Sequence, residues 1–398
     1  MKRVMERFMK RNNQRKKVTI IGVAVLAVLL IIAAIVVYVI RYAPTKEKMS
    51  GYTYFGIEEG SSQVLVILDG ERYENQGTYV NDRLYINQDL IESNINIRFY
   101  YDEESSQVYY SDTHHMYSYT ANETGYVDEE GNTYSTDYSV LISENGTYYL
   151  DWEYVAEYTD LDYELAKNPN RLVVTTSYDE VTCVDAKGKA TVRYRGGVKS
   201  LVLETVSSGA RLEVTKDLGD WLEVVTPSGI KGYVSSKQVS DTYSYVRTTT
   251  YSDDYDKISF DYDINLTWFQ VYGTAGNSNI SSLLSSTSGV NVLSPTWYSI
   301  SGSDGSLSFD GSADLVTSMH DQGIQVWVLV DDFDTSVDYE ALFKSKTART
   351  KMINRLISDA TTYGYDGINL DFENINTSYS RDFLEFLREL SIAFFAIS

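Results

Sequence analysis

The stretch YGYDGINLDFEN (residues 363–374) places three acidic side chains in a run that is otherwise apolar enough to form a buried strand. The acids are Asp366, Asp371 and Glu373. Burial of a carboxylate is costly unless it is paired, hydrogen-bonded or protonated. This stretch therefore predicts a strand of a buried sheet that also carries a functional site.

Three similar apolar runs precede this one, and helical stretches separate all four. The runs are INLTWFQVY (264–272), VNVLSPTWY (290–298), GIQVWVLVDD (323–332) and YDGINLDFE (365–373). The helical stretches are NISSLLSSTS (279–288), SADLVTSMHDQ (312–322), residues 339–364 and SRDFLEFLRELSIAF (380–394). Apolar strands that alternate with helices predict a parallel sheet buried on both faces. Four β/α units make half of an eight-unit barrel.

Alternation within the fourth run divides its side chains between two faces. Residues two apart on a strand share a face, so we expect Asn369, Asp371 and Glu373 to project together. In a β/α barrel the inward face at the carboxyl strand end is where chemistry occurs. Crowding of acids favours protonation of one of them near neutral pH, which suits it to donate a proton. The alternative is a solvated strand end whose acids cap the next helix. The other face is expected to enter the sheet–helix layer through Ile368, Leu370 and Phe372.

The string DGINLDFE resembles the signature D-G-x-D-x-D-x-E of family 18 glycoside hydrolases. This resemblance implies that Glu373 is the general acid that protonates the leaving glycosidic oxygen. It also implies that Asp371 orients the 2-acetamido group of the substrate, which itself attacks the anomeric carbon. Asp366 lies at the strand start, off the inward row, so we expect it to be structural. Asn369 is expected to support Asp371.

Two departures from that signature narrow the resemblance. Asn369 stands where chitinases carry Asp, and VWVLVDDFD (326–334) lacks their S-x-G-G string. Both features resemble the branch of spore-cortex and cell-wall enzymes, whose substrates are N-acetylglucosamine-containing glycans such as peptidoglycan. Three tryptophans are candidates for stacking on sugar faces or, alternatively, for filling the core: Trp268, Trp297 and Trp327.

The resemblance covers about residues 257–391, which is strands one to four. Members of the family have four more β/α units, with a Tyr on strand six and usually a Trp on strand eight completing the sugar site. We therefore expect a (β/α)8-type barrel truncated after about four units, and little or no activity from this chain.

The N-terminal region predicts a membrane anchor. Residues 18–40 carry no charge and span about 34 Å as a helix, enough for a hydrocarbon core of about 30 Å. The flank 1–17 has eight Lys and Arg residues and one Glu, which favours a cytoplasmic N-terminus. A cleaved signal peptide is the alternative, but the apolar run exceeds its usual length and no A-x-A-like site follows.

The charge of the remaining chain excludes some partners. Of 34 basic and 56 acidic residues, the flank holds eight and one, which leaves 26 and 55 and a net charge of about −29. Nucleic acid is thus not an expected partner. Cys183 is the only cysteine, so no intramolecular disulfide can form. His114 and His115 have no further His or Cys nearby, so we expect no metal site and no cofactor.

Two modules are predicted between the anchor and the β/α segment, after a linker at 41–57. Residues 58–178 have short strands and Asp-Gly or Asn-Asp turns. Their string QVLVILDGERY resembles the copper amine oxidase N-terminal-like stalk module, an α+β unit. Residues 179–240 resemble a bacterial SH3-like barrel through GDWLEV and GIKGYV. That barrel is either a wall-binding module or a spacer whose Trp221 is core.

These assignments predict a multidomain, single-pass membrane protein with its C-terminal domains outside the cell. The last domain, 241–398, is expected to derive from a hydrolase of β-1,4-linked N-acetylglucosamine glycans, either peptidoglycan or chitin-like. The expected partners are a cell-wall glycan and, through residues 18–40, the lipid bilayer. The alternative is a non-catalytic wall-binding or scaffold protein.

Overall fold

The computed structural model describes residues 1–252 and 259–397; residues 253–258 and 398 of the predicted last domain lie outside the described residues. The chain forms two compact units, Met1–Asn75 with Leu161–Thr249 and Gln76–Asp160 with Thr250–Ser398. Residues 58–178, which we expected to form one domain, are therefore divided between the units. The division follows the path of the chain, which enters the second unit at residue 76 and leaves it after residue 160.

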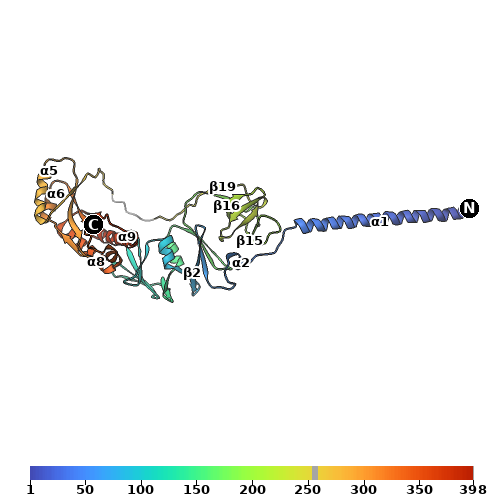
Figure 1. Cartoon of the computed structure of the whole chain (residues 1–398), viewed down its shortest axis with the longest axis horizontal. Coiled ribbons are helices and arrows are strands. Elements are labelled where there is room, and N and C mark those ends of the chain that lie inside the picture. Colours follow the sequence, from blue (N-terminus) through green and yellow to red (C-terminus); the bar gives the residue numbers. More distant parts are fainter. Residues whose placement is uncertain (253–258, 398) are drawn as a thin grey trace. The chain divides into compact units, whose positions relative to one another are not determined.

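Helix α1 (Lys2–Tyr42) is continuous through the predicted anchor and its basic flank (Figure 1). None of its side chains is buried against the protein. It is long and apolar enough to cross a membrane, by length and composition. A helix suits that environment because all its central backbone groups are hydrogen-bonded within the segment.

The first unit begins, after α1, with a small three-stranded arrangement. Strand β1 is buried along its whole length and pairs in parallel with β12, which pairs antiparallel with β11. The predicted Asp-Gly turn follows β1, where Asp69 and Gly70 have φ values of 46° and 88°. The bounds are α2 (Gly51–Phe55), β1 (Val64–Leu68), β11 (Asp162–Ala166) and β12 (Arg171–Thr175).

The same unit contains a seven-stranded sheet in the order β15-β14-β18-β17-β16-β13-β19. Its pairings are antiparallel, and its core includes Val184, Leu212, Val224 and Val234. Trp221 is half-buried. The bounds are β13 (Val181–Asp185), β14 (Ala190–Arg193), β15 (Val202–Val206), β16 (Arg211–Asp217), β17 (Trp221–Val225), β18 (Lys231–Ser235), η2 (Ser236–Gln238) and β19 (Tyr243–Tyr245).

The second unit begins with a tyrosine-rich segment, residues 76–160, that forms two antiparallel groups of strands. Strands β2, β3, β10 and β9 lie side by side in that order, and β4 to β8 form a meander. The bounds are β2 (Glu71–Val80), β3 (Arg83–Asn87), α3 (Gln88–Leu90), η1 (Ile91–Ile95), β4 (Phe99–Asp102), β5 (Gln107–Ser111), β6 (Met116–Thr120), β7 (Tyr126–Asp128), β8 (Thr133–Tyr134), β9 (Leu141–Glu144), β10 (Thr147–Asp151) and α4 (Trp152–Glu157).

The rest of the second unit confirms the four predicted parallel strands. They pair in the order β20-β21-β23-β24, and β22 adds an antiparallel hairpin to β21. The bounds are β20 (Leu266–Phe269), η3 (Thr274–Asn279), α5 (Ile280–Leu284), β21 (Val292–Ile300), β22 (Leu307–Phe309), α6 (Ala313–His320), β23 (Gln325–Asp331), α7 (Tyr339–Lys344), α8 (Lys346–Tyr363), β24 (Gly367–Asp371) and α9 (Ser380–Phe395).

One predicted helix is divided in the structure. The stretch 339–364 forms α7 and α8, separated at Ser345, whose backbone is extended (φ −87°, ψ 112°). The Ser345 hydroxyl accepts a hydrogen bond from the backbone N–H of Ala348 and so caps α8. Capping supplies a partner for a free N–H of the first turn, which favours a new helix start at this point.

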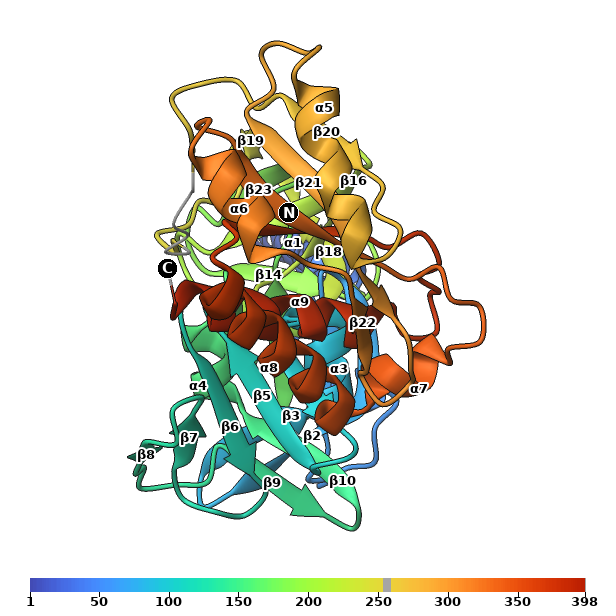
Figure 2. The ribbon, with the colours of Figure 1, turned by 90° about the vertical axis from the view of Figure 1, so that its left-hand side faces the viewer.

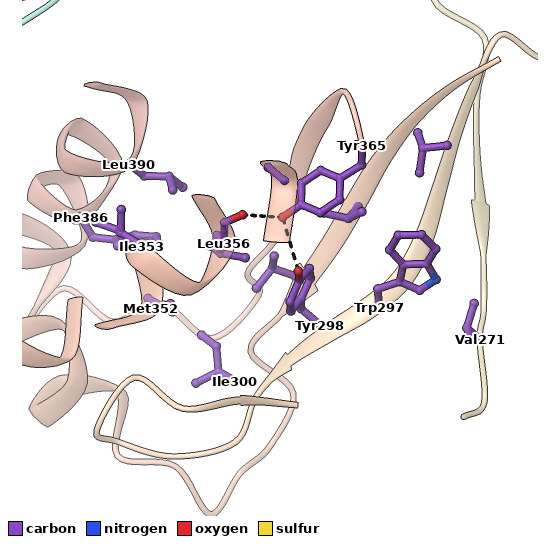
Figure 3. Packing of buried hydrophobic residues seen from close by; sticks show 14 of the residues in the cluster. Val271, Trp297, Tyr298, Ile300, Met352, Ile353, Leu356, Tyr365, Phe386 and Leu390 are labelled. Atoms are coloured by element: carbon purple, nitrogen blue, oxygen red, sulfur yellow. Dashed lines mark hydrogen bonds between the residues drawn. The ribbon is translucent and has the colours of Figure 1, made fainter. Parts of the chain in front are cut away.

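The core of this segment lies between the parallel sheet and its helices. Tyr298 and Tyr365 sit at its centre, and the Tyr365 hydroxyl donates to the Leu356 carbonyl at 2.7 Å (Figure 3). Ile368, Leu370 and Phe372 pack against this core, which confirms the predicted alternation along β24. The opposite face of β24, with Asn369 and Asp371, is therefore turned away from the helices.

Candidate functional site

The carboxyl ends of three neighbouring parallel strands each carry a polar side chain. Ser299 on β21 is in register with Asp331 on β23, and Asp331 with Asp371 on β24. The Ser299 hydroxyl donates to Asp331 Oδ2 at 2.8 Å. Parallel strands end at one edge of a sheet, so these groups form a row. Such an edge is the usual place for a site in β/α proteins.

The carboxylate of Asp332 holds the backbone that follows β24. It is 1% exposed and accepts hydrogen bonds from the backbone N–H groups of Glu373 and Asn374, both at 2.9 Å. The Asn374 side-chain amide donates to it as well, at 3.3 Å. From the other side, the Tyr379 hydroxyl donates to the Asn374 carbonyl at 2.7 Å. The backbone at Glu373 is thus held in place while its side chain stays exposed.

The two predicted catalytic carboxylates are accessible to solvent. Asp371 ends β24 and is half-buried, whereas Glu373 is exposed two residues beyond the strand. The predicted strand, 365–373, is two residues too long at each end. At its carboxyl end the Asp332 carboxylate, and not a strand partner, accepts the Glu373 N–H. Within residues 1–252 and 259–397, neither carboxylate has a hydrogen-bond or ion-pair partner. Both remain free to contact a ligand.

The two predicted supporting residues lie at different points of β24. The Asn369 side-chain N–H donates to the hydroxyl of the fully buried Ser294 at 3.1 Å, which links β24 to β21 across the face that carries Asp371. Asp366 precedes the strand at its amino end. Its Oδ2 accepts from the Val326 N–H at 2.7 Å and lies 2.9 Å from His320 Nε2. Asp366 therefore joins β24, β23 and the end of α6, away from Glu373.

The three tryptophans have three different environments. Trp297 is 2% exposed in the sheet–helix core, and its indole N–H donates to Asn277 Oδ1 at 2.8 Å. Trp297 lies on the same face of β21 as the core residue Leu293, so it fills the core, which was the alternative to stacking on a sugar. Trp268 on β20 is 66% exposed. Trp327 is half-buried and donates to Gln325 Oε1 at 3.0 Å.

The edge is acidic, and its charge affects a neighbouring tyrosine. Burial, followed by the nearby carboxylates Asp332, Asp334 and Asp331, raises the pKa of Tyr339 to about 12. Among the described residues, no Lys or Arg pairs with the acids at this edge. Throughout residues 1–252 and 259–397, no group of three or more His, Cys, Asp or Glu side chains has an arrangement suited to a metal ion.

Sequence reasoning missed Asp331, Asp332 and Ser299 as members of the site. A usable signal was present, since VDDFD ends the third apolar run as LDFEN ends the fourth. Two neighbouring parallel strands that both end in acids are expected to bring those acids together.

Comparison with known proteins matches one segment to a family. Residues 189–240 match the model described as bacterial SH3 domain, which confirms the predicted SH3-like module. A search of curated proteins found no match.

Among solved structures, the chain is similar to the C-terminal domain of an inferred chitinase from Desulfitobacterium hafniense DCB-2 (25% identity, TM-score 0.28, 32% of this chain and 41% of that one). It is also similar to a chitinase from Chromobacterium violaceum ATCC 12472, with 19% identity and a TM-score of 0.28 over 33% of this chain and 42% of that one. A third similar structure is the spore cortex-lytic enzyme SleL of Bacillus cereus, with 14% identity and a TM-score of 0.27 over 31% of this chain and 31% of that one. The chain thus spans less than half the length of each of these proteins.

Proposed function

We propose that the β/α segment hydrolyses β-1,4-linked N-acetylglucosamine glycans, with the low turnover expected from the sequence and with peptidoglycan as the first candidate substrate. The observation that carries this proposal is the position of Asp371 and Glu373. They occupy the last two acidic positions of the glycosidase-like string, at the carboxyl end of a parallel strand, with both carboxylates unpaired among the described residues and the Glu373 backbone held by Asp332.

In this proposal Glu373 acts as the general acid. Its carboxyl proton passes to the glycosidic oxygen as the bond from that oxygen to the anomeric carbon breaks. The carbonyl oxygen of the substrate 2-acetamido group attacks the anomeric carbon from the opposite side, and Asp371 orients that group. Water then attacks the anomeric carbon, the bond from that carbon to the acetamido oxygen breaks, and the water gives up a proton to the Glu373 carboxylate, which gives net retention.

The neighbouring residues contribute by position. Asp332 fixes the backbone of the acid, and precise placement of a catalytic group is worth large factors in rate. Asn369 is neutral and tied to Ser294, so it orients the strand without adding a charge beside Asp371. Trp268, exposed on β20, is the tryptophan best suited to stack on a sugar ring.

The N-terminal parts determine where the reaction takes place in this proposal. Helix α1 anchors the chain in the membrane with residues 1–17 in the cytoplasm. The SH3-like segment then lies outside and binds the wall. Linear glycan strands held near the membrane are thereby brought to the β/α segment.

The test measures new reducing ends from peptidoglycan and from chitooligosaccharides with the whole chain in detergent. Glu373→Gln keeps the shape and removes the acid, and loss of general acid catalysis typically costs about 10²–10⁴-fold. Asp321→Asn is the matched control, since Asp321 is an exposed acid before the amino end of β23. Turnover that survives Glu373→Gln within about twofold removes Glu373 from this role.

A non-catalytic wall-binding function is the second candidate. It is favoured by the exposure of both Glu373 and Trp268, because an open acid and an exposed indole can hold a glycan without excluding water. Glycan binding that is lost in Trp268→Ala, with no turnover by the parent chain, would establish this alternative. Absence of both binding and turnover would exclude both functions.

A further inference from the structure

Helices α8 and α9 bury charged side chains that contact the tyrosine-rich segment. Arg349 on α8 has a fully buried side chain. Its Nη2 lies 3.0 Å from Glu389 Oε1 on α9 and 3.2 Å from Asp102 Oδ2 on β4, and its Nη1 donates to the Phe343 carbonyl at 2.7 Å. Figure 2 shows α8 and α9 beside the strands of the tyrosine-rich segment.

Further polar contacts surround this arginine. The Tyr100 hydroxyl on β4 donates to Asp382 Oδ1 on α9 at 2.8 Å, and both residues are buried. Arg381 Nε lies 3.0 Å from Oε1 of the buried Glu92. Lys346 Nζ lies 2.7 Å from Glu389 Oε1 and 4.6 Å from the centre of the Tyr109 ring.

The turn after β4 also contacts the start of α8. Glu104 accepts hydrogen bonds from the Thr347 N–H at 3.1 Å and from the Ser345 hydroxyl at 2.9 Å. The Thr347 hydroxyl also donates to Glu104, at 2.5 Å, and this bond, followed by the one from the Thr347 N–H, lowers the pKa of the Glu104 carboxyl. An acid at this point also complements the positive end of the helix dipole. Apolar contact is added by Ile392 of α9, which packs in one cluster with Tyr100, Tyr109 and Met116.

We propose that the tyrosine-rich segment 76–160 is the fixed partner of helices α8 and α9, and that it positions β24. A buried Arg is tolerated only when its charge is balanced and its N–H groups have hydrogen-bond acceptors. Here Asp102 on β4 supplies one of the balancing charges and one of the acceptors. Helix α8 leads into β24 and α9 follows it, so contacts on both helices set both ends of the strand that carries Asp371. The segment is then part of the β/α domain and not a separate stalk.

The test is hydrogen exchange of the whole chain in detergent, which does not depend on any hydrolytic activity. In Asp102→Asn, Oδ1 can keep its bonds from Ser105, whereas the new NH2 group faces the Arg349 guanidinium. We expect amide exchange in α8 and α9 to become at least 10-fold faster, although the substitution lies on β4. Lys351→Met is the control on α8, because Lys351 and Asp304 form an exposed pair.

Two results would overturn the proposal. One is a change in Asp102→Asn confined to β4–β6, with α8 and α9 within twofold of the parent chain. If that variant does not fold, Glu104→Gln decides, because Glu104 is exposed and its loss leaves the core intact. An unchanged exchange rate at the first turn of α8 in Glu104→Gln would then refute the docking, whereas faster exchange there supports it.

Discussion

Replacement of Asp332 by Asn tests whether the Asp332 carboxylate holds the backbone at Glu373 and Asn374. The buried carboxylate accepts from two backbone N–H groups and one side-chain amide, and it uses both oxygens. An Asn keeps one oxygen, so its NH2 group must face either the Glu373 or the Asn374 N–H. At least one charge-assisted hydrogen bond is lost and two donors are opposed.

The expected cost follows from these contacts. A hydrogen bond to a charged group contributes about 1.5–3 kcal/mol, and loss of one or two here destabilises the unit by roughly 2–4 kcal/mol. For a domain of this size the melting temperature should fall by roughly 5–15 °C. Asp334→Asn is the matched control, since Asp334 is exposed and its carboxylate accepts hydrogen bonds from Ser336, two residues further along the same turn.

The assay is a thermal melt of both variants, together with amide exchange at Glu373 and Asn374. Faster exchange at these two amides in Asp332→Asn, and not in Asp334→Asn, is the expected result. Equal melting temperatures in the two variants, or unchanged protection of both amides, would refute the role of Asp332 in holding this backbone.

Three other predictions concern the core, pH and topology. Trp297→Ala should lower the free energy of unfolding by about 3–5 kcal/mol, whereas Trp268→Ala should stay within about 0.5 kcal/mol; melts with similar losses would contradict these placements. Burial, then the neighbouring Glu389, raises the pKa of Glu385 to about 7. Its contribution to stability is thus present below about pH 4.5 and is lost as pH rises through 7, so denaturant titrations from pH 5 to 8 should show a falling stability that Glu385→Gln flattens. A reporter active only in the cytoplasm, fused after Ser240, should be silent, and activity there would reverse the topology.

Local patterns in the sequence were sufficient for most of the elements. The uncharged run at 18–40 determined a helix, because only that structure hydrogen-bonds an apolar segment internally. Alternation around Asn369 and Asp371 determined which face of β24 is turned from the helices, since strand periodicity involves only neighbouring residues. The Asp69-Gly70 turn followed in the same way from residues that tolerate positive φ.

Only the tertiary structure decided how distant parts of the chain meet. The role of Asp332 depends on amides 41 and 42 positions later, and the burial of Arg349 depends on Asp102, 247 positions earlier. Only the packing around β21 decided that Trp297 fills the core, where its indole N–H donates to Asn277 Oδ1. Sequence periodicity indicates which face of a helix or strand is buried, because it depends only on neighbouring residues. Charge pairs between residues far apart in the sequence form only after packing has determined which surfaces are in contact.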